Sequence, residues 1–296
     1  MTLLDGRKTS SEIKEELKAK VDQWVSNGHR PPHLAAVLVG DNPASKSYVR
    51  NKIRFCEDVG YRSTLINLDA DITEDYLLFQ IDQLNKDPEL DGFIVQLPLP
   101  DHIDEVKVNL AIDYRKDVDG FHPTNFGKMA QGMETYLPAT PNGILELLRR
   151  YNIETSGKHC VVVGRSNIVG TPMSILMSRK DNPGNCTVTL THSRTKDIKA
   201  ELLRADIIIA AIGIPNFVKA DMVKEGAIVI DVGINRVEAP EKKSGYRLVG
   251  DVDFENVASR SSFITPVPGG VGPMTVTALM MNTFKAYSNS MAKSHE

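Results

Sequence analysis

A glycine-containing loop in the second half of the chain carries the residue types that bind nucleotide phosphates. The loop, GRSNIVG over 164–170, follows the apolar run HCVVVG and precedes Thr171-Pro172, a pair that can begin a helix. Backbone N–H groups at such a helix start bind a pyrophosphate. Gly164 permits the tight turn, but Ser166 stands where the G-x-G-x-x-G fingerprint has its second glycine. The Ser166 hydroxyl can donate to a phosphate instead, so we expect a dinucleotide site, with a merely tight strand-to-helix turn as the alternative.

The end of the next apolar run indicates which dinucleotide is bound. An NAD site usually has an Asp or Glu there, which accepts from the ribose 2′-hydroxyl. This chain has THSRT over 191–195, without a carboxylate. Ser193 and Arg194 can donate to a 2′-phosphate, and Arg165 adds a second guanidinium. We therefore expect NADP rather than NAD; the alternative is that both arginines are solvated surface residues.

Tyr48 and Lys52 share one face of a predicted helix in the first half of the chain. The helix is expected over 43–59, where a spacing of four residues places these side chains one above the other. An apolar stripe that includes Val49 and Cys56 lies beside them, so we expect Tyr48 and Lys52 to be half covered. Taken alone, the spacing is more typical of a surface lysine whose stem lies along an apolar stripe, and it does not establish a site.

Three further segments place polar groups or close backbone turns at the ends of predicted strands. DGFIVQLPLP, over 91–100, puts the amide of Gln96 near the carboxyl end of an apolar strand, the edge at which α/β sheets bind ligands. Asp117 and Asp119 follow in KDVDG, where ordinary turn formation is the alternative. TPVPGGVGPMT, over 265–275, is dense in glycine and proline and can bring backbone close to a ligand. We expect these loops to converge on one edge.

Composition and charge exclude several classes of function. The chain has 296 residues, 35 basic and 38 acidic, and a net charge of −3, which gives no electrostatic basis for binding nucleic acid or a membrane surface. Its three cysteines form no CxxC pair and fit reduced thiols in a cytoplasmic protein. MTLLDGRK has no signal-peptide core, and no run of about 18 apolar residues occurs. The histidines are scattered, so no metal is expected.

The alternation of strand and helix patterns predicts an α/β fold of two domains. Strands are expected over 33–40, 61–68, 91–100, 159–164, 186–192, 205–213, 227–233 and 262–267, and helices over 8–28, 43–59, 73–86, 104–112, 140–151 and 273–288. Such a rhythm is typical of parallel sheets covered by helices. We assign an N-terminal α/β catalytic domain to 1–142, a Rossmann-type NADP-binding domain to 143–272, and a last helix, within 273–296, that packs back on the N-terminal domain.

Six motifs spread over nearly the whole chain resemble one enzyme family. They are YVRNK, VQLPLP, KDVDG, GRSNIVGTP, DVGINR and PVPGGVGPMT, in this order. Together they are similar to the bifunctional methylenetetrahydrofolate dehydrogenase/cyclohydrolases. The resemblance implies NADP-dependent oxidation of 5,10-methylenetetrahydrofolate to the methenyl compound and its hydrolysis to 10-formyltetrahydrofolate, in one-carbon folate metabolism. It also implies a homodimer formed by the cofactor domains.

The same resemblance assigns roles to individual residues. It implies that Lys52 is the central catalytic residue and that Tyr48, Gln96 and Asp119 surround the pterin and its one-carbon bridge. The folate site is expected to include Tyr48, Lys52, Val95, Gln96, Leu97, Asp119, Pro268, Gly269, Gly270, Val271 and Gly272. The NADP site is expected to include Gly164, Arg165, Ser166, Ser193, Arg194 and Ile234. Ala139 departs from the cysteine that many relatives carry, at a position where the chemistry needs no thiol.

Two other readings remain open at this point. A Rossmann dehydrogenase of the shikimate type would need a lysine–aspartate pair beside a secondary alcohol and would not hydrolyse a methenyl compound. A redox-sensing NADP-binding regulator would bind the cofactor but leave folate unchanged. The sequence leaves open the balance of the two activities, the strictness of NADP over NAD and the oligomeric state.

Overall fold

The computed structural model describes residues 1–241 and 245–293, and its packing divides the chain into two compact units. Unit 1 comprises Met1–Ser10 and Thr140–Thr275, and unit 2 comprises Ser11–Ala139 and Val276–Glu296. The predicted NADP-binding segment 143–272 falls inside unit 1. The first ten residues, which we placed in the N-terminal domain, belong to unit 1 as well, because β1 pairs there with β11.

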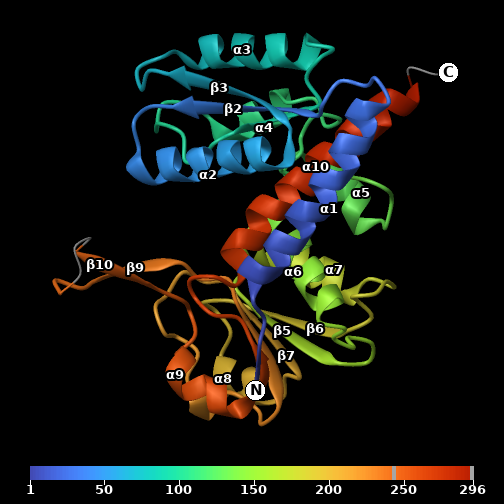
Figure 1. Ribbon diagram of the computed structural model, residues 1–296. Helices are drawn as coiled ribbons and strands as arrows, with labels where there is room; N and C mark the ends of the chain where they lie inside the picture. Colours follow the sequence, from blue (N-terminus) through green and yellow to red (C-terminus); the bar gives the residue numbers. More distant parts are fainter. Residues whose placement is uncertain (242–244, 294–296) are drawn as a thin grey trace. The chain divides into compact units, whose positions relative to one another are not determined.

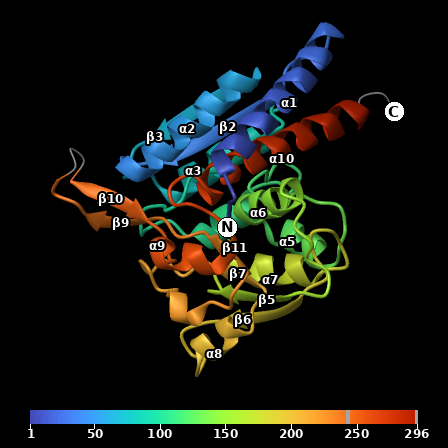
Figure 2. The same ribbon diagram turned by 60° about the horizontal axis from the view of Figure 1, so that its bottom comes forward.

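Unit 1 is built on a parallel six-stranded sheet. Its spatial order is β1-β11-β8-β7-β5-β6. The strands are β1 (Thr2–Leu3), β5 (His159–Val163), β6 (Thr187–Thr191), β7 (Ile207–Ala210), β8 (Ala227–Asp231) and β11 (Ser261–Ile264). The helices that belong to it are α6 (Ala139–Arg150), α7 (Gly170–Ser178), α8 (Ile198–Leu203) and α9 (Phe254–Val257). Figure 2 shows this sheet with β6, β5 and β7 side by side.

The strand order of unit 1 indicates where α/β sheets of this kind usually bind a ligand. The first strand of the Rossmann-type alternation, β5, lies between β6 and β7. The strand order therefore changes direction at β5. Open α/β sheets bind ligands at the carboxyl ends of the strands at such a switch point. The side chains of β7 are fully buried, as expected for an apolar strand covered on both faces.

A short antiparallel hairpin in unit 1 lies outside the predicted elements. It consists of β9 (Asn235–Glu238) and β10 (Tyr246–Val249), and it extends away from the six-stranded sheet (Figure 2). These segments are four residues long, none of their side chains is buried and each contains charged residues, so they carry only a weak hydrophobic pattern. β1 was also missed, because a two-residue strand has no period.

Unit 2 contains a parallel three-stranded sheet in the order β3-β2-β4. The strands are β2 (His33–Val39), β3 (Arg62–Leu68) and β4 (Gly92–Val95). The helices that belong wholly to this unit are α2 (Pro43–Val59), α3 (Glu74–Lys86), α4 (Glu105–Ala111) and α5 (Pro123–Ala130). The strand predicted within 91–100 pairs as far as Val95, and the proline-containing segment after Gln96 leaves the sheet, as expected.

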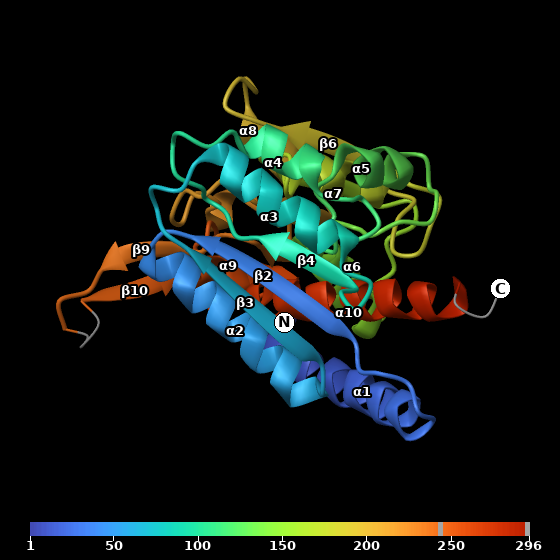
Figure 3. The same ribbon diagram turned by 90° about the horizontal axis from the view of Figure 1, so that it is seen from above.

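Helices cover both faces of the three-stranded sheet. Figures 1 and 3 show α3 on one face and α2 on the other. Leu77 and Ile81 of α3 are fully buried against Ala35 and Val37 of the central strand, and Val108 of α4 joins the same core. The helix α5 was not predicted, because its segment PTNFGKMA reads as loop; His122 caps it by accepting from the backbone N–H of Thr124.

Two long helices, α1 (Gly6–Ser26) and α10 (Val271–Lys293), contribute residues to both units. The C-terminal part of α10 packs on unit 2, as predicted. Asn282 donates from Nδ2 to the backbone oxygens of Val118 and Leu137 at 2.8 and 2.9 Å, and the Tyr287 hydroxyl donates to the Arg30 oxygen at 2.7 Å. Within the described residues no helix is long and apolar enough to cross a bilayer.

Candidate active site

A buried lysine and a glutamine meet at the carboxyl end of the sheet of unit 2. Lys52 on α2 is only 9% exposed, and its Nζ donates to Oε1 of Gln96 at 3.2 Å. Gln96 directly follows β4. Its backbone N–H donates to the backbone oxygen of Val37 at 2.9 Å, and its Nε2 donates to the backbone oxygen of Leu97 at 2.7 Å. These bonds hold the amide with its oxygen toward Lys52. Among the described residues Lys52 forms no ion pair, so its amine faces a neutral acceptor.

Tyr48 lies one turn before Lys52 on α2 and is 46% exposed, in line with the expected half-covered position. Lys52 is more buried than we expected, because the end of β4 covers it in addition to the stripe on its own helix. Val95 is buried and Leu97 is half-buried, and both pack in the hydrophobic core with α3 and α4. The exposed phenol of Tyr48 suits a flat aromatic ligand.

The two aspartates of KDVDG have different environments. Asp117 is buried, and its carboxylate accepts from the backbone N–H groups of Gly120 and His122 and from Nδ2 of Asn125. Burial raises the pKa of Asp117, while these hydrogen bonds oppose the rise. It is therefore a turn-forming residue. Asp119 is half-buried, and its backbone oxygen accepts from Ala139, so its carboxylate remains the candidate for binding a ligand.

The loop after β5 in unit 1 contains the residues that we predicted for a phosphate site. Gly164 has φ +112°, and a Cβ there would lie 2.2 Å from the backbone oxygen of Ala211, so only glycine fits. Oγ of Ser166 accepts from the N–H groups of Val169 and Gly170 at 3.2 and 3.4 Å. A hydroxyl that accepts these bonds keeps its own hydrogen for a phosphate. Gly170 begins α7 there, so a helix N-terminus adjoins the loop, an arrangement typical of anion-binding sites.

The end of β6 has no carboxylate in the position that NAD requires. Ser193 and Arg194 are exposed just after this strand, and Arg165 is exposed in the loop after the neighbouring strand β5. None of the ion pairs within residues 1–241 and 245–293 involves Arg165 or Arg194. Both guanidinium groups are therefore available to an anion, which fits a 2′-phosphate.

A small cavity in unit 1 brings Ile234 together with the glycine-rich loop before α10. Its volume is about 120 Å³, and it is lined by Arg7, Asp231–Ile234 and Pro266–Pro273. Ile234 is exposed at 44%, and Gly272 lies against its side chain. We did not predict Arg7 or Asp231 for this site. Asp231 begins the motif DVGINR, which was a usable signal, whereas nothing in the sequence singles out Arg7.

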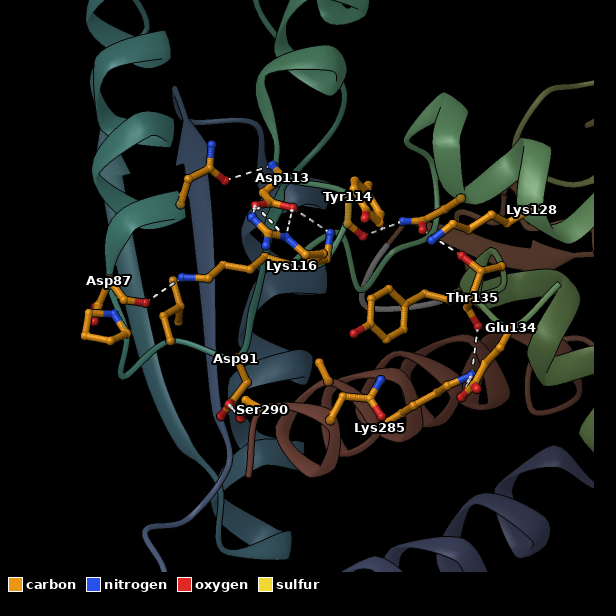
Figure 4. Close-up of a pocket in the computed structure, with 18 of the residues that line it drawn as sticks. Asp87, Asp91, Asp113, Tyr114, Lys116, Lys128, Glu134, Thr135, Lys285 and Ser290 are labelled. Atoms are coloured by element: carbon orange, nitrogen blue, oxygen red, sulfur yellow. Dashed lines mark hydrogen bonds and ion pairs between the residues drawn. The ribbon is translucent and has the colours of Figure 1, made fainter. Parts of the chain in front are cut away.

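Unit 2 contains a second, larger cavity, of about 500 Å³, that none of the predicted site residues lines (Figure 4). Its charged side chains already have partners within the protein. Arg115 pairs with Asp113, Lys285 pairs with Glu134, and Lys116 donates to backbone oxygens, including that of Asp87. Burial lowers the pKa of Lys116. These charged side chains bind one another or backbone oxygens, and the residues assigned to folate and NADP lie elsewhere.

The fold and these sites define a dinucleotide-dependent oxidoreductase with a separate α/β catalytic unit. A family model described as "Tetrahydrofolate dehydrogenase/cyclohydrolase, catalytic domain" matches residues 4–119, and one described as "Tetrahydrofolate dehydrogenase/cyclohydrolase, NAD(P)-binding domain" matches residues 138–291. The chain belongs to the tetrahydrofolate dehydrogenase/cyclohydrolase family, which confirms the resemblance drawn from the six motifs.

Individual relatives agree over nearly their whole length. The "Bifunctional protein FolD" of Flavobacterium johnsoniae is 62% identical over 293 residues, which cover 99% of each chain. A crystal structure of the bifunctional FolD enzyme from Campylobacter jejuni matches with a TM-score of 0.92 and 49% identity, covering 98% of this chain and 99% of that one. The Trypanosoma brucei enzyme, complexed with NADP cofactor and inhibitor, matches with a TM-score of 0.92 and 37% identity, covering 98% of each chain.

Proposed function

We propose that the chain oxidises 5,10-methylenetetrahydrofolate with NADP and hydrolyses the methenyl product to 10-formyltetrahydrofolate, with Lys52 as the catalytic residue. The proposal rests above all on the contact between Lys52 and Gln96, because it supplies a buried amine without a carboxylate partner. An ammonium held beside a forming methenyl cation would repel it, so a lysine that can work as the neutral amine suits both reactions.

The hydrogen bond to Gln96 also sets the direction of the amine. A neutral amine can donate one hydrogen to Oε1 of Gln96 and keep its lone pair free to take a proton from attacking water. Tyr48 is placed to offer its ring to the folate and its hydroxyl to that water or to Lys52. We assign Asp119 to the pterin, whose amino group and ring N–H present two hydrogens side by side to a carboxylate. We also assign Val95 and Leu97 of unit 2 to folate binding, and separately the loop Pro268–Gly272 of unit 1.

NADP, when bound, accepts the hydride from the one-carbon bridge. The chain's own residues hold it: Gly164, Ser166 and the start of α7 fit a pyrophosphate, and Arg165, Ser193 and Arg194 fit the 2′-phosphate. Ile234 is exposed beside the loop Pro268–Gly272, where it can contact the cofactor. In functional terms we assign 143–272 to NADP and 1–142 with 273–296 to folate.

The substitution Lys52→Met tests the proposal. We expect it to abolish hydrolysis of the methenyl compound while NADP binding persists, because the amine is lost and the cofactor residues belong to unit 1. The measurement is a spectrophotometric assay of methylenetetrahydrofolate oxidation followed by methenyl decay, with NADP affinity determined separately. Lys46→Met is the matched control, since Lys46 lies on the same helix, is about half exposed and pairs with Asp41. Hydrolysis at a near-normal rate in Lys52→Met would exclude the assignment.

The enzyme is also proposed to work in the cytoplasm as a homodimer formed through its NADP-binding domains. Its three cysteines are buried free thiols, which suits a reducing compartment. Sedimentation equilibrium of the purified chain checks the oligomeric state: a mass of about twice the 32.7 kDa of one chain is expected, and a monomer across the concentration range would contradict it.

A further inference from the structure

Asp231, the last residue of β8, uses both carboxylate oxygens to bind backbone N–H groups of neighbouring turns. Its Oδ1 accepts from Gly233 and from Asp251, each at 2.9 Å, and its Oδ2 accepts from Val252 at 2.9 Å. The side chain is buried, with 3% of the residue exposed. One carboxylate therefore joins the turn after β8 to the segment that follows β10.

Asp251 continues this connection to a third turn. Its Oδ2 accepts from the backbone N–H groups of Ile212 and Gly213, directly after β7, at 2.7 and 2.9 Å. Its Oδ1 accepts from the side-chain Nδ2 of Asn235 at 2.9 Å. Asp251 is fully buried. The two aspartates thus bind five backbone N–H groups and one side-chain amide.

Two glycines show how closely these carboxylates are fitted to the backbone. A Cβ on Gly250 would lie 1.7 Å from Oδ2 of Asp231, and a Cβ on Gly233 would lie 2.3 Å from Oδ1 of Asp251. Oγ1 of Thr265, at the end of β11, accepts from the backbone N–H of Asp231 at 2.7 Å. The ends of β7, β8 and β11 and the segment after β10 are therefore fixed to one another at the carboxyl edge of the sheet.

We propose that Asp231 and Asp251 are positioning residues of the NADP site, a role that rests on the function proposed above. Ile234, assigned to the cofactor, is flanked by Gly233 and Asn235, and each of these is held by one of the two aspartates. The turn held by Asp251 begins at Ile212. The residue before it, Ala211, has its backbone oxygen packed closely against Gly164 of the phosphate loop. Loops that are fixed before the cofactor arrives lose little further conformational entropy when it binds.

The two positions differ in what an asparagine would do there. At position 231 both carboxylate oxygens accept from backbone N–H groups, whose direction is fixed. In Asp231→Asn the side-chain NH₂ replaces one of these oxygens, so a donor then faces a donor and that hydrogen bond is lost. At position 251 one partner is the amide of Asn235, which can rotate and offer its oxygen. A positioning role therefore predicts that Asp231→Asn is much more damaging than Asp251→Asn, whereas Asp251→Leu, which removes both acceptors, is damaging again.

The experiment compares NADP affinity, by fluorescence titration, in the wild type and these variants. We expect the NADP dissociation constant to rise at least tenfold in Asp231→Asn and in Asp251→Leu, and less than threefold in Asp251→Asn. The Michaelis constant for NADP should rise more than kcat falls, and cyclohydrolase activity should fall less than NADP affinity. Asp253→Asn is the matched control: Asp253 lies two residues from Asp251, bonds to the side chains of Asn256 and Lys219, and should leave NADP affinity unchanged.

Hydrogen exchange in the wild type supplies a second measurement if a variant does not fold. The amides of Ile212, Gly213, Gly233 and Val252 should be protected before NADP is added. Rapid exchange at these amides, equal affinity losses in Asp231→Asn and Asp251→Asn, or parallel losses of NADP affinity and cyclohydrolase activity would overturn the positioning role. A wild-type chain that binds no NADP would instead overturn the proposed function.

Discussion

The proposed contacts of Arg165 and Arg194 with the 2′-phosphate predict that the enzyme discriminates NADP from NAD. Both are exposed beside the carboxyl ends of adjacent strands, and hydrogen bonds from guanidinium to phosphate contribute about 1.5–3 kcal/mol each. Replacing both with glutamine should raise the Michaelis constant for NADP by at least tenfold and change that for NAD by less than threefold. Steady-state kinetics with both cofactors measures this, with Arg204→Gln, at the C-terminal cap of α8, as an exposed control. Equal increases for both cofactors would contradict the 2′-phosphate assignment.

Residue spacing predicted which side chains share a face, but it could not predict how buried each one is. Lys52 and Tyr48 do lie on one face of α2, yet one is 9% exposed and the other 46%. The difference comes from Gln96, which lies 44 residues further along the chain and covers only Lys52. Asp117 and Asp119 were likewise indistinguishable in sequence, because Asp117 is bound by a helix, α5, that the sequence pattern did not reveal.

At the scale of elements, an ion pair joins the segments that lead into β2 and β4. Nη1 and Nη2 of Arg30 donate to the two carboxylate oxygens of Asp91 at 2.7 and 2.8 Å, and Asp91 also accepts from the backbone N–H of His33. The Asp91 carboxylate is fully buried and Arg30 is about one fifth exposed. Asp91→Asn should lower the free energy of unfolding by about 2–4 kcal/mol, because it removes the buried counter-charge of the guanidinium and leaves only the exposed carboxylate of Glu89, at 3.8 Å.

Urea denaturation measures this loss, and the chain offers a matched control. Asp82 and Lys86 form an exposed ion pair within α3, so Asp82→Asn should change the free energy of unfolding by less than about 0.5 kcal/mol. Similar effects of Asp82→Asn and Asp91→Asn would show that burial does not strengthen the Arg30 pair.

His33, the first residue of β2, should make unit 2 sensitive to acid. Its ring is bonded to the oxygen of Glu89 and to Oγ1 of Thr64, and burial lowers its pKa below the ordinary value near 6.5. The unfolded chain then binds more protons than the folded one, so His33 contributes stability above about pH 6.5 and loses it as the pH falls. Denaturation at several pH values should show that the free energy of unfolding falls less between pH 7 and pH 5 in His33→Gln than in the wild type. Parallel curves would exclude this role.

Elements with a strong period were predicted to within a few residues, and those without one were missed. The helix α2 begins and ends where its apolar stripe and Pro43 place it, and β2 and β5 match their apolar runs. The hairpin β9–β10 and the short strand β1 depend on pairing partners rather than on a pattern of their own. Contacts of this kind arise only when the chain has folded, which is why sequence patterns do not contain them.

At the scale of the molecule, each unit has its own hydrophobic core. One core is formed by β2 and β4 with α3 and α4, and the other by β5, β7 and β8 with α8. The sequence predicted this division from length and from the restart of the strand–helix rhythm. It did not predict that α1 and α10 would each give residues to both units, because periodicity describes a helix and not its partners.

These two shared helices predict that the units unfold together. Loss of either core removes packing from part of α1 and of α10, so calorimetry should show one transition for the chain. NADP at 100 times its dissociation constant adds about 2.7 kcal/mol to the free energy of unfolding. For a chain of this length, that raises the midpoint temperature of unfolding by roughly 4–6 °C. Asp91→Asn, in unit 2, should lower the same midpoint, and NADP should still raise it. Two transitions, of which NADP moves one and Asp91→Asn moves the other, would show that the cores unfold independently.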